Sequence, residues 1–284
     1  MKISEVLSKY FNERNIKSFE LSDVNRLMCY YLKLELKEYI INKKSINLES
    51  ESIVQIYNLL DMYYINKIPM QYILGKQVFF NESYIVNDTV LIPRQDSEIL
   101  VNEAIKYINE NNFKNCLDLC TGTGCIGISI AKNSDIKKVD LVDISKDVLI
   151  VTNMNIKLNN VESKCKCINS NLFLDLNENV KYDIIVSNPP YIKKKDIEML
   201  DDYVKKEPIL ALDGGESGLD FYKKIFKDAC GFLNDNSYIL CEIGFDQKED
   251  LEKIIKEYDF YEYIDTIKDY GGNNRVIVCR FHQK

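Results

Sequence analysis

The 284 residues are enough for two domains, and 46% hydrophobic with 29% charged residues is typical of a globular protein; no apolar run approaches the ~20 residues that span a bilayer. The formal net charge of −7 disfavours a protein that grips nucleic acid through its phosphates, and a start as charged as MKISEVLSKYFNER is not a secretory signal. Nine cysteines without a CxxC pair argue against zinc and for a reducing, cytoplasmic compartment, and the single histidine, His282, disfavours histidine-based catalysis.

Helical periodicity dominates the first 75 residues. Apolar side chains recur every three or four positions in three stretches, which predicts helices that each bury one face. We interpret residues 1–75 as a small helical domain with these stripes as its core. The stripes are formed by Ile3, Val6, Leu7, Tyr10 and Phe11, by Val24, Leu27, Met28, Tyr31 and Leu32, and by Ile53, Ile56, Tyr57 and Leu60.

Strand patterns follow the helical region. Residues 76–92 predict a β-hairpin linker, with its turn near Asn81–Ser83. From residue 93 to 284, strand-like runs alternate with helical ones, which is typical of a mostly parallel α/β sheet with right-handed crossovers. The strand-like runs are 116–120, 139–143, 165–168, 182–187, 237–243 and 275–281.

A glycine-rich loop follows the first of these strands. Gly122, Gly124 and Gly127 match the G-x-G-x-x-G pattern, and Asp143 ends the next strand, so a dinucleotide site is one interpretation. Asp118 favours another, because its carboxylate would repel a pyrophosphate and attract an ammonium group. The ligand favoured is S-adenosylmethionine, a nucleoside with a zwitterionic tail, and Asp143 would accept its ribose hydroxyls.

The tetrapeptide Asn188–Tyr191, NPPY, ends the apolar run at 182–187. Proline has no N–H group and a fixed φ, so this segment is stiff and cannot continue a sheet ladder. It leaves carbonyl oxygens, one side-chain amide and one aromatic ring available to a ligand.

Taken together, several ordered segments resemble the HemK family, the peptide chain release factor N5-glutamine methyltransferases, over most of the chain. Pro69–Gly75 resembles the family's PxQYxxG segment, and Leu91–Glu98 resembles IPRPDTE with departures at Gln95 and Ser97. Cys120 and Asn171 depart where the family usually has a glycine and an acidic residue. Further matching segments are the loop at 118–127, Asp143–Ser145, Ser170–Phe173, NPPY, Glu207–Pro208, Ala211–Leu219, Glu242–Gly244 with Gln247, and Arg275–Val276.

The resemblance implies a Rossmann-like class I S-adenosylmethionine methyltransferase domain at 93–284 and a helical domain at 1–75 that contacts the release factor. It implies S-adenosyl-L-methionine as donor, S-adenosyl-L-homocysteine as product, no metal, and no direct contact with nucleic acid or membrane. The substrate would be the side-chain amide of the glutamine in the release factor's GGQ motif. The implied cofactor-binding residues are Asp118, Cys120, Thr121, Gly122, Thr123, Gly124, Asp143, Asn171, Leu172 and Asn188, and the implied catalytic residues are Asn188, Pro189, Pro190 and Tyr191.

The chemistry of an amide substrate accounts for NPPY. An amide nitrogen is a weak nucleophile and too weak an acid for any side chain here to deprotonate, so we expect catalysis by positioning, which can supply roughly 7–11 kcal/mol. As the nitrogen attacks, its N–H groups become stronger donors. The Asn188 side-chain oxygen and the Pro189 carbonyl would stabilise that state, and Tyr191 would stack on the amide and exclude water.

Two alternatives stay open. A sister enzyme that modifies a glutamine of a ribosomal protein shares the catalytic motif. Nucleic-acid N6-adenine methyltransferases share the pattern [DNS]PP[YFW], but they would be expected to have a basic groove, which the acidic net charge does not favour.

Overall fold

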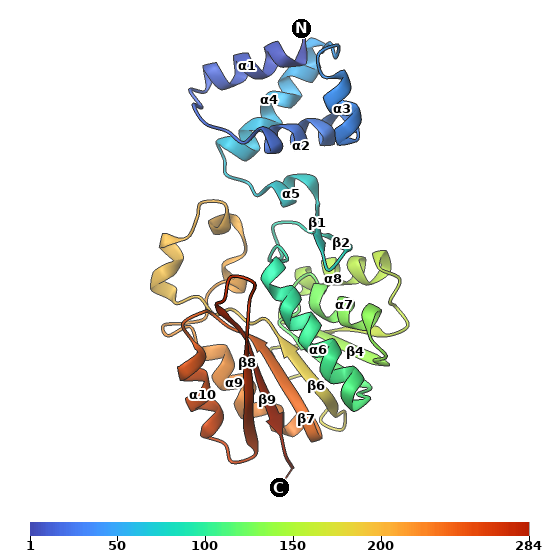
Figure 1. The fold of residues 1–284 in the computed structure, drawn as a ribbon, viewed down its shortest axis with the longest axis vertical. Coiled ribbons are helices and arrows are strands. Elements are labelled where there is room, and N and C mark those ends of the chain that lie inside the picture. The colour runs from blue at the N-terminus through green and yellow to red at the C-terminus, as the bar shows by residue number, and fades with distance from the viewer. Residues whose placement is uncertain (284) are drawn as a thin grey trace. The chain divides into compact units, whose positions relative to one another are not determined.

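Residues 1–283 are described by a computed structural model that divides into two units (Figure 1). The first unit contains Met1–Gly75 and Asp202–Lys206, and the second contains Lys76–Asp201 and the chain from Glu207 onward. The prediction of domains at 1–75 and 93–284 placed 76–92 between them as a linker, whereas the hairpin in this segment is part of the second unit. In residues 1–283, no helix combines the length and apolar character needed to cross a membrane.

The first unit is helical, as the sequence predicts. Tyr10, Leu27 and Leu60 are buried in one core to which the predicted stripes contribute. The short helix α3 was missed because Tyr39 is its one buried residue, so no apolar stripe marks it. The helices of this unit are α1 Ile3–Glu13, α2 Leu21–Leu32, α3 Leu36–Asn42, α4 Ser50–Tyr64 and α5 Met70–Leu74, with the 3-10 helix η3 Val204–Lys206.

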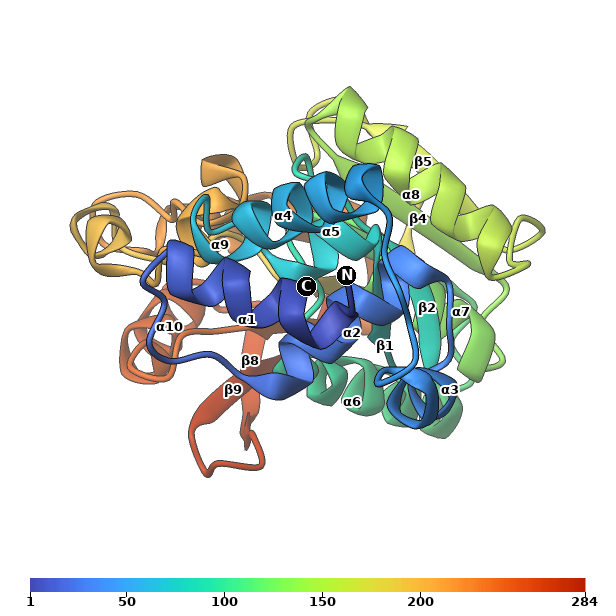
Figure 2. The same ribbon diagram turned by 90° about the horizontal axis from the view of Figure 1, so that it is seen from above.

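The second unit is built on a seven-stranded sheet with the order β5-β4-β3-β6-β7-β9-β8. The strands β3 to β7 run parallel, and β9 pairs antiparallel with both β7 and β8. Seen from above, β4 and β5 lie on one side and β8 and β9 on the other (Figure 2). The bounds are β3 Asn115–Leu119, β4 Lys138–Asp143, β5 Cys165–Asn169, β6 Tyr182–Ser187, β7 Leu233–Glu242, β8 Tyr261–Lys268 and β9 Asn274–Phe281.

Six of these strands confirm the predicted runs, and β8 was missed. This strand, YEYIDTIK, forms the edge of the sheet, and most of its side chains are partly or fully exposed. Its charged residues suit an edge strand, because charge discourages pairing with another chain. They also hide the alternation of apolar and polar residues that the sequence analysis depends on.

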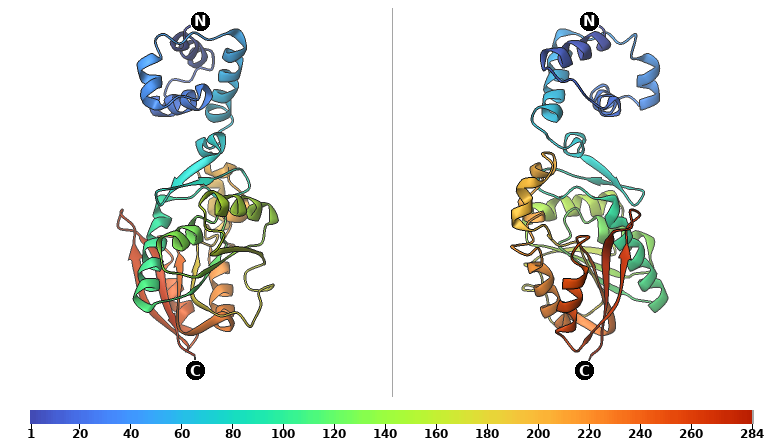
Figure 3. Two further views of the ribbon diagram at one scale, coloured as in Figure 1. Left: turned by 90° about the vertical axis from the view of Figure 1, so that its right-hand side faces the viewer. Right: turned by 60° about the vertical axis from the view of Figure 1, so that its left-hand side comes forward.

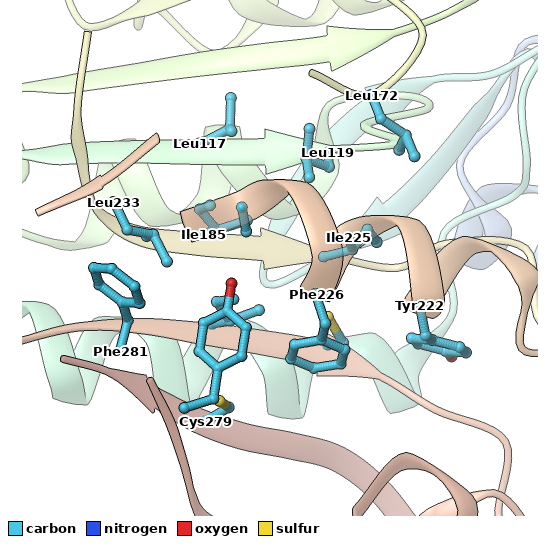
Figure 4. Close-up of a cluster of buried hydrophobic side chains, with 14 of the residues drawn as sticks. Leu117, Leu119, Leu172, Ile185, Tyr222, Ile225, Phe226, Leu233, Cys279 and Phe281 are labelled. Atoms are coloured by element: carbon cyan, nitrogen blue, oxygen red, sulfur yellow. The ribbon is translucent and has the colours of Figure 1, made fainter. Parts of the chain in front are cut away.

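Helices cover both faces of the sheet (Figure 3). Alternate side chains along one strand point to opposite faces, so Cys116 joins the core under α6, α7 and α8 and Leu117 joins the core under α9 and α10. Figure 4 shows this second core, in which Ile185 of β6 packs near Phe226 of α9. The helices are α6 Glu98–Asn111, α7 Cys125–Asn133, α8 Lys146–Leu158, α9 Asp220–Asp228 and α10 Lys248–Lys256, with the 3-10 helices η1 Gln95–Ser97, η2 Lys194–Met199, η4 Ile209–Ala211 and η5 Ala229–Phe232.

The predicted hairpin is present as β1 Lys76–Phe79 and β2 Glu82–Ile85. Its turn is formed by Phe80 and Asn81, slightly before the predicted position, and both residues have positive φ values of 49° and 63°. Such angles match the twist of a tight hairpin. Asn155 of α8 bonds both backbone groups of Ile85, so the hairpin is fastened to the sheet's helical layer.

Candidate active site

A cavity of about 480 Å³ lies at the carboxyl ends of β3, β4, β5 and β6, where the strand order reverses. Open α/β sheets bind ligands at such a switch point. The predicted site residues that line the cavity are Cys120, Thr121, Gly122, Thr123, Asp143, Asn171, Leu172, Asn188 and Pro190. The predicted residues that do not line it are Asp118, Gly124, Pro189 and Tyr191.

The glycine-rich loop joins β3 to α7, and its backbone N–H groups bond to the loop itself and to the end of β4. The N–H groups of Thr121 and Gly124 donate to the carbonyls of Val142 and Thr121. The N–H of Gly122 donates to Asp143, and that of Cys125 donates to the Thr123 hydroxyl. A pyrophosphate is bound by free N–H groups at the start of a helix. Because these donors are already used, the loop disfavours the dinucleotide interpretation.

Two positions of the loop, Gly127 and Cys120, have a backbone or packing geometry that favours glycine. At Gly127, a Cβ atom would lie 2.3 Å from the Leu141 side chain and 2.9 Å from Asp118, so only glycine lets α7 pack this closely on β4. Cys120 has a φ of 58°, in the left-handed region that favours glycine. The family's usual glycine at this position therefore has a conformational reason, and Cys120 adopts the same backbone angle at some cost.

Asp118 corrects the sequence interpretation. It was expected to face an ammonium group, but it is 0% exposed and lies beneath the loop. Its Oδ2 accepts from the Thr121 hydroxyl at 2.6 Å and from the Gly127 N–H at 3.0 Å. Burial raises the pKa of Asp118 to about 7. The carboxyl group thus supports the loop from inside the sheet, because the hydrogen bonds that it accepts turn it away from the cavity.

Asp143 does line the cavity, at the end of β4. Its Oδ2 accepts from the Gly122 N–H at 3.1 Å and its Oδ1 from the Ser145 N–H at 3.0 Å. Burial raises the pKa of this carboxyl group, while these backbone donors oppose the rise. Each oxygen keeps a second lone pair, so Asp143 has the capacity to accept a pair of hydroxyl groups.

NPPY follows directly on β6, and its residues have different surroundings. Asn188 is half-buried and lines the cavity beside buried Pro190, and Pro189 is buried behind them. Tyr191 packs on the core shown in Figure 4, and its hydroxyl donates to Glu242 at 3.3 Å. The ring therefore supports the segment, and its predicted stacking on a substrate amide stays a prediction.

The segment 212–214 pairs with Ile192, the residue directly after NPPY. The N–H of Ile192 donates to Leu212, and Gly214 donates back to the Ile192 carbonyl. At Gly214, a Cβ atom would lie 2.7 Å from the Tyr191 Cα atom, so this segment also depends on a glycine for its close approach.

The predicted site residues did not include the buried polar residues Ser97, Glu207 and Glu242. Ser97, which is 2% exposed, accepts a hydrogen bond from the Asn188 amide at 3.3 Å and donates to Glu242. Glu207 is buried as well and accepts from the Ile92 N–H and from Arg94. One signal was present in the sequence: Glu242 is an acidic residue at the end of the apolar run 238–241.

Burial raises the pKa of Glu242, while the Ser97 hydroxyl, nearby Arg275 and the Tyr191 hydroxyl oppose the rise. Its two carboxyl oxygens accept hydrogen bonds from the hydroxyl groups of Ser97 and Tyr191. Burial also raises the pKa of Tyr191, so its hydroxyl stays a donor.

Comparison with known proteins identifies the family. A model described as the methyltransferase small domain matches residues 95–216. The release factor glutamine methyltransferase of Clostridium acetobutylicum is 36% identical over 283 residues, which cover 98% of both chains. The ribosomal protein uL3 glutamine methyltransferase of Francisella tularensis subsp. tularensis is 39% identical over 181 residues, which cover 63% of this chain and 57% of its own.

Among solved structures, SMU.776 complexed with SAH has a TM-score of 0.54 at 15% identity, with 72% of this chain and 56% of that chain covered. A likeness at this identity supports the fold alone. The seven-stranded sheet with its antiparallel β9 is the Rossmann-like sheet of class I methyltransferases. From these matches over nearly its whole length, the chain belongs to the release factor glutamine methyltransferase family.

Proposed function

We propose that this enzyme transfers the methyl group of S-adenosyl-L-methionine to the side-chain amide nitrogen of the glutamine in the GGQ motif of a peptide chain release factor. The observation that carries the proposal is Asn188, which places a side-chain amide on the wall of the cavity at the switch point of the sheet. The match to a release factor glutamine methyltransferase over 98% of both chains supports the substrate class.

The cavity fits the methyl donor. Its volume of about 480 Å³ lies in the range of small-ligand sites, roughly 300–1,000 Å³. Asp143 and Asn171 offer polar groups to the nucleoside, and the loop at 120–124 surrounds the methionine end. When bound, S-adenosylmethionine supplies an electrophilic methyl group on a sulfonium.

The chain's own contribution is to position the substrate amide. The Asn188 side-chain oxygen, on the wall of the cavity, is proposed as one acceptor for the N–H bonds of the glutamine amide. The backbone carbonyl of Pro189, a buried residue outside the cavity lining, is proposed as the second, and the stiffness of Pro189–Pro190 keeps it in place. As the nitrogen attacks, its N–H bonds become more acidic and these hydrogen bonds strengthen, which lowers the barrier more than it stabilises the bound substrate.

The first unit, proposed as the substrate-recognition domain at 1–75, would bind the release factor away from its glutamine. We also propose a cytoplasmic location, because all nine cysteines are unpaired in the described chain, which suits a reducing compartment. We propose no membrane or nucleic-acid partner, and the net charge of −7 disfavours binding to phosphates. Removal of residues 1–75 is expected to raise KM for the release factor far more than KM for the cofactor.

The direct test uses a labelled methyl donor. The enzyme is incubated separately with release factor, ribosomal protein uL3 and DNA, and the label is located by mass spectrometry. We expect label on the GGQ glutamine and none on a release factor in which that glutamine is replaced by alanine. Label on DNA alone, or none on any protein, would overturn the proposal.

The uL3 reaction is the second candidate, because a uL3 glutamine methyltransferase is 39% identical over 181 residues. That match covers 63% of this chain, whereas the release factor enzyme matches 98% of it. The uL3 arm of the same experiment separates the two substrates.

A further inference from the structure

Three side chains from distant parts of the chain form a hydrogen-bonded row that ends at Asn188. Glu242 closes β7, Ser97 closes η1, and Asn188 follows β6. Ser97 Oγ donates to Glu242 Oε2 at 2.5 Å, and Asn188 Nδ2 donates to Ser97 Oγ at 3.3 Å. Ser97 and Glu242 are each 2% exposed, so solvent competes little for these hydrogen bonds.

With Glu242 ionised, the row has one direction. An ionised carboxylate accepts hydrogen bonds and donates none, so the Ser97 hydroxyl donates its hydrogen bond to Glu242. The Ser97 oxygen is then left as an acceptor, which requires the NH₂ end of the Asn188 amide. If the amide were reversed, the Asn188 oxygen would face the Ser97 oxygen, and the buried Ser97 oxygen would lose its donor. The Asn188 Oδ1 atom must therefore point away from Ser97.

The carboxylate is itself held in place. The Tyr191 hydroxyl donates to Glu242 Oε1 at 3.3 Å, so the two oxygens of Glu242 have different donors. The Tyr222 hydroxyl donates to the Glu242 carbonyl at 2.6 Å and fixes the backbone at the same residue. Glu242 thus has little freedom to turn away from Ser97.

We propose that Ser97 and Glu242 are positioning residues, which orient the Asn188 amide so that its oxygen is the group offered to the substrate. The inference rests on the proposed function, in which that oxygen accepts a hydrogen bond from the substrate glutamine. Glu242 does not line the cavity, and Ser97 does, but its hydroxyl is used by the hydrogen bonds with Glu242 and Asn188. Their effect passes through Asn188 and appears in turnover.

A double-mutant cycle tests this dependence with the full-length enzyme, S-adenosylmethionine and a release factor. Ser97→Ala is expected to lower kcat about tenfold, with KM for both substrates within about threefold, because one hydrogen bond that orients the amide is lost. Ser97→Thr retains the hydroxyl and is expected to restore kcat. In the Asn188→Ala background, Ser97→Ala is expected to change kcat less than twofold, because the group that it orients is already absent.

Ser129→Ala is the matched control, since Ser129 is a buried serine that hydrogen-bonds a tyrosine, Tyr84, away from Asn188. It should cost stability but leave kcat unchanged. If Ser97→Ala does not fold, Ser97→Cys replaces it in the experiment, because it is similar in size to serine but lacks the hydroxyl group.

The outcomes separate this inference from the proposed function. Wild-type activity on the glutamine together with unchanged kcat in Ser97→Ala would overturn the inference alone. A tenfold loss that persists in the Asn188→Ala background would also overturn it, because Ser97 would then act through another group. A wild-type enzyme that transfers no methyl group to a glutamine would overturn both.

Discussion

The two sides of the cavity are built in different ways. On the side of β3 and β4, the hydrogen bonds of Asp118 and Asp143 join groups 3, 9 and 21 residues apart. On the side of β6 and β7, those of Ser97 join groups 91 and 145 residues apart. The first side is formed by two neighbouring strands and the segment between them, whereas the second joins residues from three distant parts of the chain. A local motif suits a cofactor site, and the long-range network fixes the side chain that would meet the substrate.

The largest effect is expected on the long-range side. Asn188→Ala removes one preorganised acceptor and should lower turnover by ~10²-fold or more, by analogy with the loss of one oxyanion-hole group. Cofactor affinity should change much less, because the loop at 120–124 and Asp143 are untouched. Single-turnover kinetics and calorimetry measure the two quantities. Equal losses in both would remove Asn188 from its proposed role.

The next effect concerns the local side and depends on pH. The folded-state pKa of Asp118, about 7, is raised above its ordinary value of 3.8 by burial, so the stability that it contributes is full below that ordinary value and is lost as pH rises through 7. Asp118→Asn does not titrate. Between pH 5 and pH 8, the wild-type free energy of unfolding should therefore fall relative to the variant by on the order of 2 kcal/mol. Urea unfolding of both proteins at the two pH values measures this difference. If the free energies of unfolding of wild type and variant change equally with pH, the pKa of Asp118 is not raised in the folded state.

Asp143→Asn should lower cofactor affinity more than turnover, which is the opposite of the result expected for Asn188→Ala. The charge and one acceptor are lost, so we expect cofactor affinity to fall roughly tenfold or more. Turnover at saturating cofactor should stay within a few-fold of wild type, because Asn188 is unchanged. Titration calorimetry and kcat at high donor concentration test the split. A variant that loses turnover but keeps its affinity would contradict the division of roles.

The smallest effect is expected at Cys120. Replacing it with glycine relieves left-handed strain of about 1–2 kcal/mol but adds unfolded-state entropy of roughly 0.5–1 kcal/mol. The free energy of unfolding should change by no more than about 1 kcal/mol. Leu119→Ala, beside it in the core, should cost about 2–5 kcal/mol. A large loss in Cys120→Gly would mean that the side chain has a packing role.

Elements with a continuous local pattern could be predicted from the sequence, and elements that bury few side chains could not. The strands β3, β4 and β6 are apolar runs buried on both faces, and the loop between β3 and α7 is a continuous pattern, so both were predictable. The edge strand β8 and the short helix α3 bury too little for their periodicity to show.

For the site, the sequence placed Asp143 and Asn188 at strand ends, and both residues line the cavity. It could not reveal that Asp118 turns inward, because the Gly127 N–H that it bonds lies on the next helix. It could not bring Ser97 to Glu242 either, since nothing local links residues that only the completed sheet brings together.

The central claim is that Asn188 and Pro189 orient a neutral amide for methyl transfer, and the most direct measurement is a crystal structure of the enzyme with S-adenosylhomocysteine and a release factor. We predict that the nitrogen of the GGQ glutamine lies about 3 Å from both the Asn188 Oδ1 atom and the Pro189 carbonyl oxygen. A glutamine nitrogen that approaches neither oxygen, or an Asn188 amide with its nitrogen toward the substrate, would contradict the account.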